Sequence, residues 1–347
     1  MRKKNRRSLS DNHAAVDALP ATATKAGPMA FTFGEPEAID RTSLMDYSQV
    51  YRTGRWYEPP ISLRGLANMT GVAPHHASAL FLKRNLLVDA FEPTPFLSTR
   101  EFAALAMDFV TFANGYLQRH DSIGGRLLAL KRVPALQTRV GLAIGDYWFT
   151  PEAGAPIQFD NGSIVHLFDV DVRQEIYGVP EYVSALHAVQ LNRAATLFRR
   201  KYYENGSHAG FILSMTDAAQ NPEDIDAIRK ALKDSKGPGN FRNLFVYSPG
   251  GHKDGIKLIP ISEVGARDEF ASIKNTSRDD MLAAHRVPPQ LLGVVPNNAG
   301  GFGDVEKARL SFVRTEIAPI QSRMLSINED LGVEAIRFKA AEQVAGS

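Results

Sequence analysis

The sequence predicts an α+β fold in which long helices border a small insertion of mixed helix and strand. Two uninterrupted helical patterns, at 181–204 and 266–285, enclose a segment of about 50 residues that contains three short apolar runs. The half of the chain before them alternates short helical and strand-like patterns. With 347 residues, 44% of them hydrophobic and 22% charged, the chain is long enough for two or three domains with apolar cores.

The composition excludes several classes of protein. Cysteine is absent, so disulfides and thiolate metal sites are excluded. No run of about 18 apolar residues is present, and we expect neither a transmembrane helix nor a membrane partner. The 40 basic and 38 acidic residues give a net charge of +2, which argues against a protein that grips DNA tightly and permits one that lets DNA slide past.

The chain before the first long helix is interpreted as a tail followed by one domain. Residues 1–28 are rich in Arg, Lys, Ser and Asn and lack apolar periodicity, so they are predicted to form a disordered basic tail. Residues 29–180 mix short helices with short strands and are interpreted as one α+β domain. Helices are predicted at 74–87 and 99–113, and strands at 112–119, 127–133 and 163–168.

The first long helix is predicted over 181–204. It follows a Gly-Val-Pro break and ends at an Asn-Gly pair, at 205–206. At about 1.5 Å per residue it would span roughly 35 Å. Its last turns carry three cations that suit the negative end of a helix dipole, Arg199, Arg200 and Lys201.

The insertion after this helix has the pattern of a compact α/β module. A helix is predicted at 222–233, where Asn221 can cap its first turn. A turn rich in Gly and Pro follows at 236–240. The predicted strands of the module are 211–213, 244–247 and 256–260.

Two further helices are predicted after the insertion. The helix at 266–285 must end before the Val-Pro-Pro sequence at 287–289. Four glycines make 292–303 a flexible loop. Beyond it Asp304 is expected to cap a helix that continues to about residue 331 and is kinked at Pro319.

Two pairs of side chains are candidates for a metal site. Asp169 and Asp171 could hold a divalent cation between them, but alternation of polar and apolar residues at a strand end gives the same spacing by default. His75 and His76 are adjacent, so on a helix they point about 100° apart and chelate poorly. We interpret the histidines as a surface pair.

The remaining motifs do not predict catalysis. The glycine-rich sequence at 300–304 resembles a phosphate-binding loop but lacks the Gly-Lys-Ser/Thr ending of a nucleotide site. Asp279 and Asp280 lie near His285 in the sequence, but helical spacing separates their directions, and we interpret all three as exposed or intersubunit groups. No catalytic residue, metal site or cofactor is therefore predicted.

The order of elements and several segments resemble one known family. These segments are 31–36, 56–60, 83–87, 174–182, 191–212, 235–245, 278–280 and 284–293. They resemble the portal proteins of temperate contractile-tailed bacteriophages and related prophages, the PBSX-type portal family. The resemblance covers about residues 31–338 and departs at 112–116, where the small residues stand in another order, and after residue 338, so any crown is expected to be short.

The resemblance implies a division of the chain into the parts of a portal subunit. Behind the basic tail 1–28, these parts are the wing at 29–180, the first stem helix at 181–206, the clip at 207–262, the second stem helix at 263–291, the tunnel loop at 292–303, and the long kinked helix with a short C-terminal wing or crown remainder at 304–347.

The resemblance also implies roles for individual residues, none of them catalytic or metal-binding. The tunnel loop would include Gly293, Asn297, Asn298, Gly300, Gly301, Phe302 and Gly303. Contacts to DNA in the channel would come from Arg199, Arg200, Lys201, Lys307 and Arg309. The docking surface of the clip would include Lys236, Gly237, Asn240, Arg242 and Lys253.

The implied function is that of a head–tail connector without a cofactor or nucleotide of its own. Twelve copies would form a ring at one capsid vertex, assembled in the host bacterial cytoplasm and retained in the virion, through which double-stranded DNA is packaged and ejected. The expected partners are the terminase large subunit, the major capsid and scaffold proteins, and a head-completion or neck protein.

Two other functions remain open. One is a metal-dependent nucleic-acid-processing enzyme that uses Asp169 and Asp171, and the other is a different ring adaptor of the virion, against which the size of the chain and the long-helix pair speak.

Overall fold

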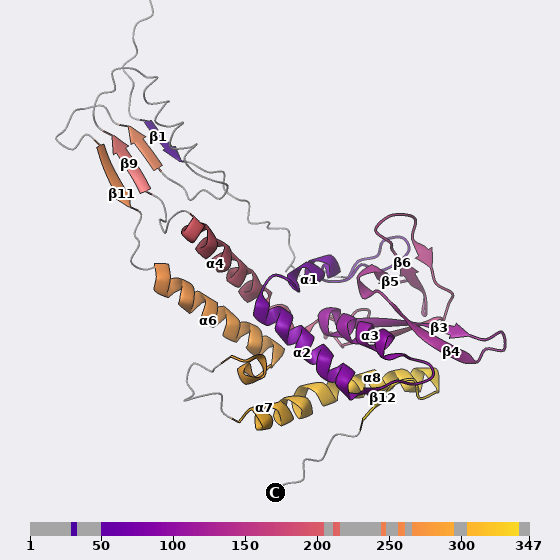
Figure 1. Ribbon diagram of the computed structural model, residues 1–347. Helices are drawn as coiled ribbons and strands as arrows, with labels where there is room; N and C mark the ends of the chain where they lie inside the picture. The colour runs from indigo at the N-terminus through magenta and orange to yellow at the C-terminus, as the bar shows by residue number, and fades with distance from the viewer. Residues whose placement is uncertain are drawn as a thin grey trace, which may run out of the picture. The chain divides into compact units, whose positions relative to one another are not determined.

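The computed structural model describes residues 29–32, 50–204, 211–215, 244–247, 256–260, 266–294 and 304–339 (Figure 1). The chain divides into two units, one formed by Met1–Glu35 with Asn205–Glu263 and the other by Pro36–Glu204 with Val264–Ser347. Within the described ranges, no helix combines the length and the apolar character needed to cross a membrane.

The described part of the smaller unit is a four-stranded sheet. Its strands are β1 (Met29–Thr32), β9 (Phe211–Met215), β10 (Leu244–Tyr247) and β11 (Ile256–Pro260). They lie in the order β1-β10-β9-β11, with β10 parallel to β9 and the other two pairs antiparallel. The strands predicted at 244–247 and 256–260 are confirmed, and the strand predicted at 211–213 continues to Met215.

The first strand corrects the expected start of the wing. We expected residues 29–180 to form one domain, but Met29–Thr32 pairs with β10, with Met29 opposite Tyr247 and Thr32 opposite Leu244. These residues therefore belong to the same unit as the insertion. Pairing between segments so far apart in the chain leaves no local pattern that a sequence-based prediction could use.

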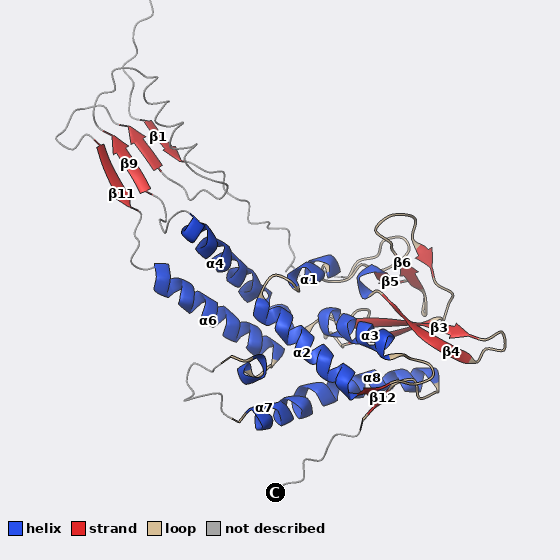
Figure 2. Ribbon diagram, in the orientation of Figure 1, coloured by secondary structure: helices blue, strands red, loops and turns tan. Residues whose placement is uncertain are grey.

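The larger unit is built around a three-stranded antiparallel sheet with helices packed on it (Figure 2). The sheet has the order β4-β3-β8 and consists of β3 (Asn114–Asp121), β4 (Leu127–Val133) and β8 (Ile164–Phe168). Helix α3 (Thr99–Phe112) packs against β3 and β4, and α2 (Pro74–Ala90) packs against α3. The core between them contains fully buried residues, among them Phe102, Leu105, Leu117 and Leu130.

Smaller elements complete this unit. They are α1 (Leu63–Met69), β2 (Phe91–Glu92), η1 (Ala135–Gln137), β5 (Thr138–Val140), β6 (Tyr147–Phe149), β7 (Ile157–Gln158) and β12 (Arg337–Phe338). Strands β5, β6 and β7 form a second three-stranded sheet, and β12 pairs with β2. The last pairing ties the C-terminal part of the chain to the domain that residues 50–180 form.

The end of α3 is fixed by a close contact with the segment that precedes the first long helix. Helix α3 stops at Ala113, which has a φ of 54°. The Asn114 side chain then donates to the Gly178 carbonyl at 2.8 Å and accepts from the Gly178 N–H at 2.9 Å. A Cβ on Gly178 would lie 2.0 Å from the Ala113 carbonyl oxygen, so only glycine fits here.

Two antiparallel helices follow, and they are the long pair that the sequence predicts. The first begins as a 3-10 turn, η2 (Glu181–Ala185), and continues as α4 (Leu186–Glu204), while α6 (Ala266–His285) has the predicted bounds. The two helices lie side by side (Figure 1). Tyr182 stacks on His285, and Asn192 bonds to Ser277 further along, so the start of one helix lies beside the end of the other.

The last long helix contains an irregular turn. It runs as α7 (Val305–Phe312), a π-helical segment η4 (Val313–Ile317) and α8 (Ala318–Leu331). Pro319 has no N–H to donate, and in the turn before it the Ala318 N–H bonds to the carbonyl of Val313, five residues back. The irregularity that Pro319 predicts therefore takes the form of a wide turn.

Candidate functional site

The helix pair α4–α6 is the first part of the candidate site. Asn192 and Ser277, each only 1% exposed, join the helices through a hydrogen bond of 2.8 Å from Asn192 Nδ2 to Ser277 Oγ. A buried polar pair of this kind holds two helices in one register, because sliding them would leave both groups without partners. The pair is therefore built as a strut of fixed alignment.

The cations predicted on α4 lie towards its C-terminal end. Arg199 and Arg200 are exposed, and Lys201 follows in the same helix. Burial, with the charge of Arg199 as the second cause, lowers the pKa of Lys274 on α6. Positive charge thus gathers where Arg199 comes near Lys274.

The cations predicted on α7 are instead neutralised locally. Lys307 binds Asp304 at 3.1 Å, and Arg309 binds Glu306 at 2.8 Å, each three residues along the helix. Asp304 caps the helix by accepting from the Lys307 N–H at 2.9 Å, and this bond holds the pKa of the Asp304 carboxyl below its usual value. The first turn of α7 therefore carries no net charge.

The chain turns sharply after α6 to reach the predicted tunnel loop. Arg286 has a φ of 55° and Gly293 a φ of 70°, both in the left-handed region. Between them the 3-10 turn η3 (Pro289–Leu292) follows Pro288. Glycine suits the second of these positions without strain, whereas the turn at Arg286 is closed by the Val287 N–H, which donates to the Leu282 carbonyl at 2.9 Å.

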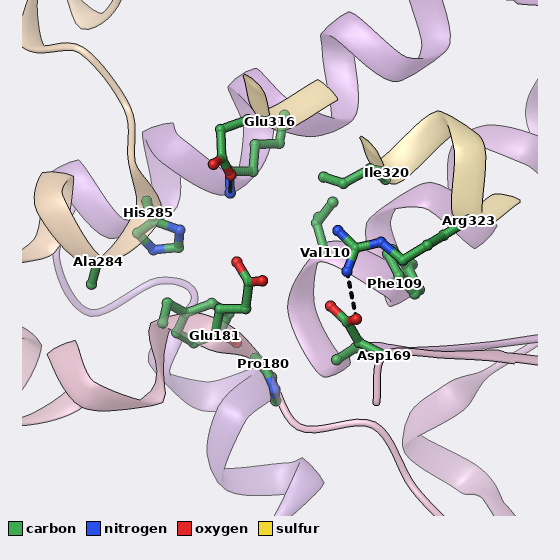
Figure 3. Close-up of a pocket in the computed structure, with 13 residues that line it drawn as sticks. Phe109, Val110, Asp169, Pro180, Glu181, Ala284, His285, Glu316, Ile320 and Arg323 are labelled. Carbon is green, nitrogen blue, oxygen red and sulfur yellow. Dashed lines mark hydrogen bonds and ion pairs between the residues drawn. The ribbon is translucent and has the colours of Figure 1, made fainter. Parts of the chain in front are cut away.

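A cluster of four charged side chains, Lys83, Glu181, Arg286 and Glu316, lies at the base of the strut, where η2 begins and α6 ends. Figure 3 shows Glu181 and Glu316 of this cluster. Lys83 from α2 binds Glu316 at 3.3 Å, and both side chains are about nine-tenths buried, at 10% and 9% exposed. Arg286 binds Glu316 at 3.3 Å and also binds Glu181. The cluster is neutral overall and joins α2, the starts and ends of the two long helices and the π-helical segment.

The carboxylates of this cluster stabilise the charged forms of its two cations. Burial lowers the pKa of Lys83, and the carboxylate of Glu316 opposes that shift. The hydrogen bond to Glu181 raises the pKa of Arg286. Beside the cluster is a cavity of about 40 Å³, large enough for a few water molecules but not for a substrate. The ion pairs are therefore suited to holding α2, η2, the end of α6 and the π-helical segment together.

Two histidines and a tyrosine pack next to these charges, which corrects two predictions. His76 and His285 are 0% and 1% exposed, so His76 is not part of a surface pair and His285 is not an exposed group. They share a hydrogen bond of 2.9 Å, and Tyr182 packs against both rings. Burial lowers the pKa of His76 to about 4 and, with the charges of His76 and Lys83, that of His285 to about 2.

The candidate metal carboxylates are both occupied by arginines. Asp169 binds Arg323 of α8 at 2.5 Å, and Asp171 binds Arg173 at 3.1 Å. In the part of the chain that the structure describes, no three His, Asp or Glu side chains gather as a metal ion would require. Asp279 and Asp280 are exposed, as expected.

Several predicted site residues lie outside the described residues. In the tunnel loop these are Asn297, Asn298, Gly300, Gly301, Phe302 and Gly303. In the clip they are Lys236, Gly237, Asn240, Arg242 and Lys253.

The sequence-based prediction missed the buried cluster of Lys83, Glu316, Arg286, His76 and His285. Charged residues and histidines on a helix are ordinarily surface residues, so their types gave no signal. The only available hint was their spacing, since Lys83 and His76 fall seven residues apart on the same face of α2.

Comparison with known proteins gives a consistent result. The model of the family described as "Phage portal protein" matches residues 85–341. The chain is 48% identical over 321 residues to a "Probable portal protein" of Escherichia phage P2, covering 92% of this chain and 93% of that protein. It is 35% identical over 294 residues to a "Probable portal protein" of Haemophilus phage HP1 (strain HP1c1), covering 83% and 85%.

A solved structure shares the fold. The crystal structure of an HK97 family phage portal protein from Corynebacterium diphtheriae matches with a TM-score of 0.57 and 14% sequence identity, covering 79% of this chain and 94% of that one.

Proposed function

This chain belongs to the phage portal protein family, and we propose that twelve copies of it form a ring at one vertex of a tailed-phage capsid. Portal proteins are virion components, and the family is structural and not enzymatic. The family to which the sequence motifs pointed is thereby confirmed, whereas the narrower PBSX-type assignment stays a prediction. Double-stranded DNA would enter and leave the capsid through the ring.

The observation that carries this proposal is the strut formed by α4 and α6. The Asn192–Ser277 hydrogen bond fixes its alignment, and the buried cluster around Glu316 anchors its base. Identical struts repeated around an axis make the wall of a tube. Between the two helices the chain enters a separate unit, formed by residues 205–263 together with Met1–Glu35, which supports the assignment of the insertion as the clip.

We assign the inner surface of the tube to two groups of residues. The predicted tunnel loop, from Leu292 to Gly303, would project towards the DNA and yield as it passes. Arg199, Arg200 and Lys201 would offset phosphate repulsion, because α4 carries no acidic residue near them before Glu204. Lys307 and Arg309 already bind acids of their own helix, so their contribution to DNA contact would be the weaker one.

The other parts of the chain are assigned to partners by the same proposal. The clip, through Lys236, Gly237, Asn240, Arg242 and Lys253, would dock the terminase large subunit and later a head-completion or neck protein. The wing would contact the major capsid and scaffold proteins during assembly in the host bacterial cytoplasm. The chain would need no cofactor and would hydrolyse no nucleotide itself.

Electron microscopy of the purified chain tests the proposal directly. We expect annular particles with twelve-fold symmetry, and no ATP hydrolysis unless terminase is added. A folded chain that stays monomeric under all solution conditions, or that hydrolyses ATP alone, would contradict the proposal.

A further inference from the structure

The two helices of the strut expose opposite charges. Helix α4 has no acidic residue between Leu186 and Arg200, and Arg193 is exposed near its middle. Helix α6 exposes two adjacent carboxylates, Asp279 and Asp280. The side of α4 that carries Arg193 is therefore basic, and the side of α6 that carries Asp279 and Asp280 is acidic, although α6 also carries Lys274 and Arg278.

One residue on each face has no ion-pair partner within the described part of the chain. Asp279 binds Arg278 of its own helix at 2.8 Å. Neither Arg193 nor Asp280 takes part in any ion pair among the described residues. Within the described part of the chain, no opposite charge therefore occupies either side chain.

Arg193 and Asp280 also lie at nearly the same height on the strut. The Asn192–Ser277 hydrogen bond defines a common level of the two antiparallel helices. Arg193 follows Asn192 directly, and Asp280 lies three residues beyond Ser277 in the opposite direction, so roughly 6 Å of helix rise separates them. Arg199 and Arg200 lie roughly 10 Å and 12 Å above that level and match the carboxylates poorly.

The position of a residue along the ring axis decides which residues of two neighbouring subunits can meet, because a closed ring repeats each residue at one level along that axis. Neighbouring subunits in such a ring meet through two different faces, and a contact can join only residues of similar height. The exposed charges of α4 and α6 fulfil both conditions. Opposite charges on the two faces also disfavour the wrong pairing of α4 with α4 or α6 with α6.

We propose that Arg193 of one subunit pairs with Asp280 of the next, so that the exposed faces of α4 and α6 form a contact between neighbouring copies of this chain in the portal ring. The inference rests on the proposed ring and adds the surfaces that build it. One exposed ion pair contributes little by itself, but the contact repeats at every boundary, and a ring closes only when all of its contacts form.

Charge reversal tests this contact. Asp280→Arg places like charges opposite each other at every boundary, and so does Arg193→Asp. Each variant should lower the fraction of chains in rings by about tenfold or more at a fixed concentration, as measured by mass photometry and negative-stain microscopy. The double variant exchanges the two charges and should restore rings towards the wild-type fraction.

Two controls separate the contact from other effects. Asp330→Arg makes the same change of charge on the exposed side of α8 and should leave ring formation unchanged. Circular dichroism and thermal unfolding should show that each single-reversal variant remains folded. If the single variants form rings as readily as wild type, or if the double variant is no better than they are, the proposed contact is wrong.

Cross-linking gives an independent measurement, because the chain has no cysteine of its own. Differently tagged Arg193→Cys and Asp280→Cys chains should be joined by a bis-maleimide when they are assembled together. Rings without such a mixed product would overturn the contact and leave the ring itself intact. A wild-type chain that forms no ring would overturn the proposed function and this contact together.

Discussion

His76 and His285 share a hydrogen bond of 2.9 Å although 209 positions separate them in the chain. The bond joins α2 to the last residue of α6, next to the ion pairs of Glu316. One ring nitrogen must donate and the other accept, so the pair is stable only when at least one ring is neutral. The end of α6 is therefore joined to α2 by a hydrogen bond that is lost when both imidazoles are protonated.

We predict that the protein loses stability as the pH falls below about 6.5. Burial keeps the pKa of His76 near 4 and that of His285 near 2, while the unfolded chain takes up protons at the ordinary histidine value. The unfolded state thus binds more protons in this window, and lowering the pH from 7 to 5 should cost on the order of 2 kcal/mol for each imidazole.

Denaturant unfolding at a series of pH values measures this loss. His76→Gln should reduce the slope between pH 5 and 6.5, while His187→Gln, at an exposed position of α4, should leave it unchanged. An identical slope in wild type and His76→Gln would show that His76 is not protected in the folded chain.

The buried ion pairs predict an asymmetry between two variants. Glu316→Gln leaves Lys83 as an uncompensated buried cation and should destabilise the protein by about 3–5 kcal/mol. Lys83→Met should cost less, because Glu316 keeps its bond to Arg286 at 3.3 Å. The free energy of unfolding checks this order, and Arg64→Met, which removes an exposed pair with Glu152, should change it by less than about 1 kcal/mol.

Two glycines should respond differently to replacement by alanine. At Gly178 a Cβ would lie 2.0 Å from the Ala113 carbonyl oxygen, so Gly178→Ala should prevent normal folding of the junction between the end of α3 and the segment that leads into η2. At Gly293 no atom lies within 4 Å of the added Cβ, and only the φ of 70° opposes alanine, at a cost of about 1–2 kcal/mol. Soluble yield and thermal unfolding should rank Gly178→Ala well below Gly293→Ala.

Stiffening the predicted tunnel loop should impair DNA packaging and leave ring assembly unchanged. Replacing Gly300, Gly301 and Gly303 by Ala restricts the backbone that we expect to yield to moving DNA. Rings should form normally in electron micrographs, while the DNA retained per particle should fall. Gly71→Ala, in an open position of the wing, serves as the matched control. Normal packaging by the loop variant would show that the loop is not a mobile element of the channel.

Local patterns in the sequence were sufficient for most of the helices and strands. The helix 266–285 and the strands 127–133, 244–247 and 256–260 have the predicted bounds, because Pro, Gly or polar residues mark their ends. The start of the first stem helix was less well predicted, since η2 is a 3-10 turn and the α-helix begins only at Leu186.

Features that depend on distant contacts could not be predicted. The pairing of Met29–Thr32 with β10 and the burial of His76 against His285 both arise from segments that meet only in the folded chain. The same holds for Asp169, whose carboxylate is bound by Arg323 from α8. A residue's type and spacing indicate its element but not the partner that tertiary packing gives it.

The π-helical segment Val313–Ile317 sets which side of α8 faces the interior, through the number of residues that it contains. Its wide turn inserts one extra residue, which rotates everything after it by about 100° relative to a continuous α-helix. Ile320, Met324 and Ile327 face the interior only in that rotated phase. A deletion of one residue here would remove the wide turn, but it would also turn the apolar side of α8 towards water. Single-residue deletions should therefore be tolerated less well in this segment than most substitutions.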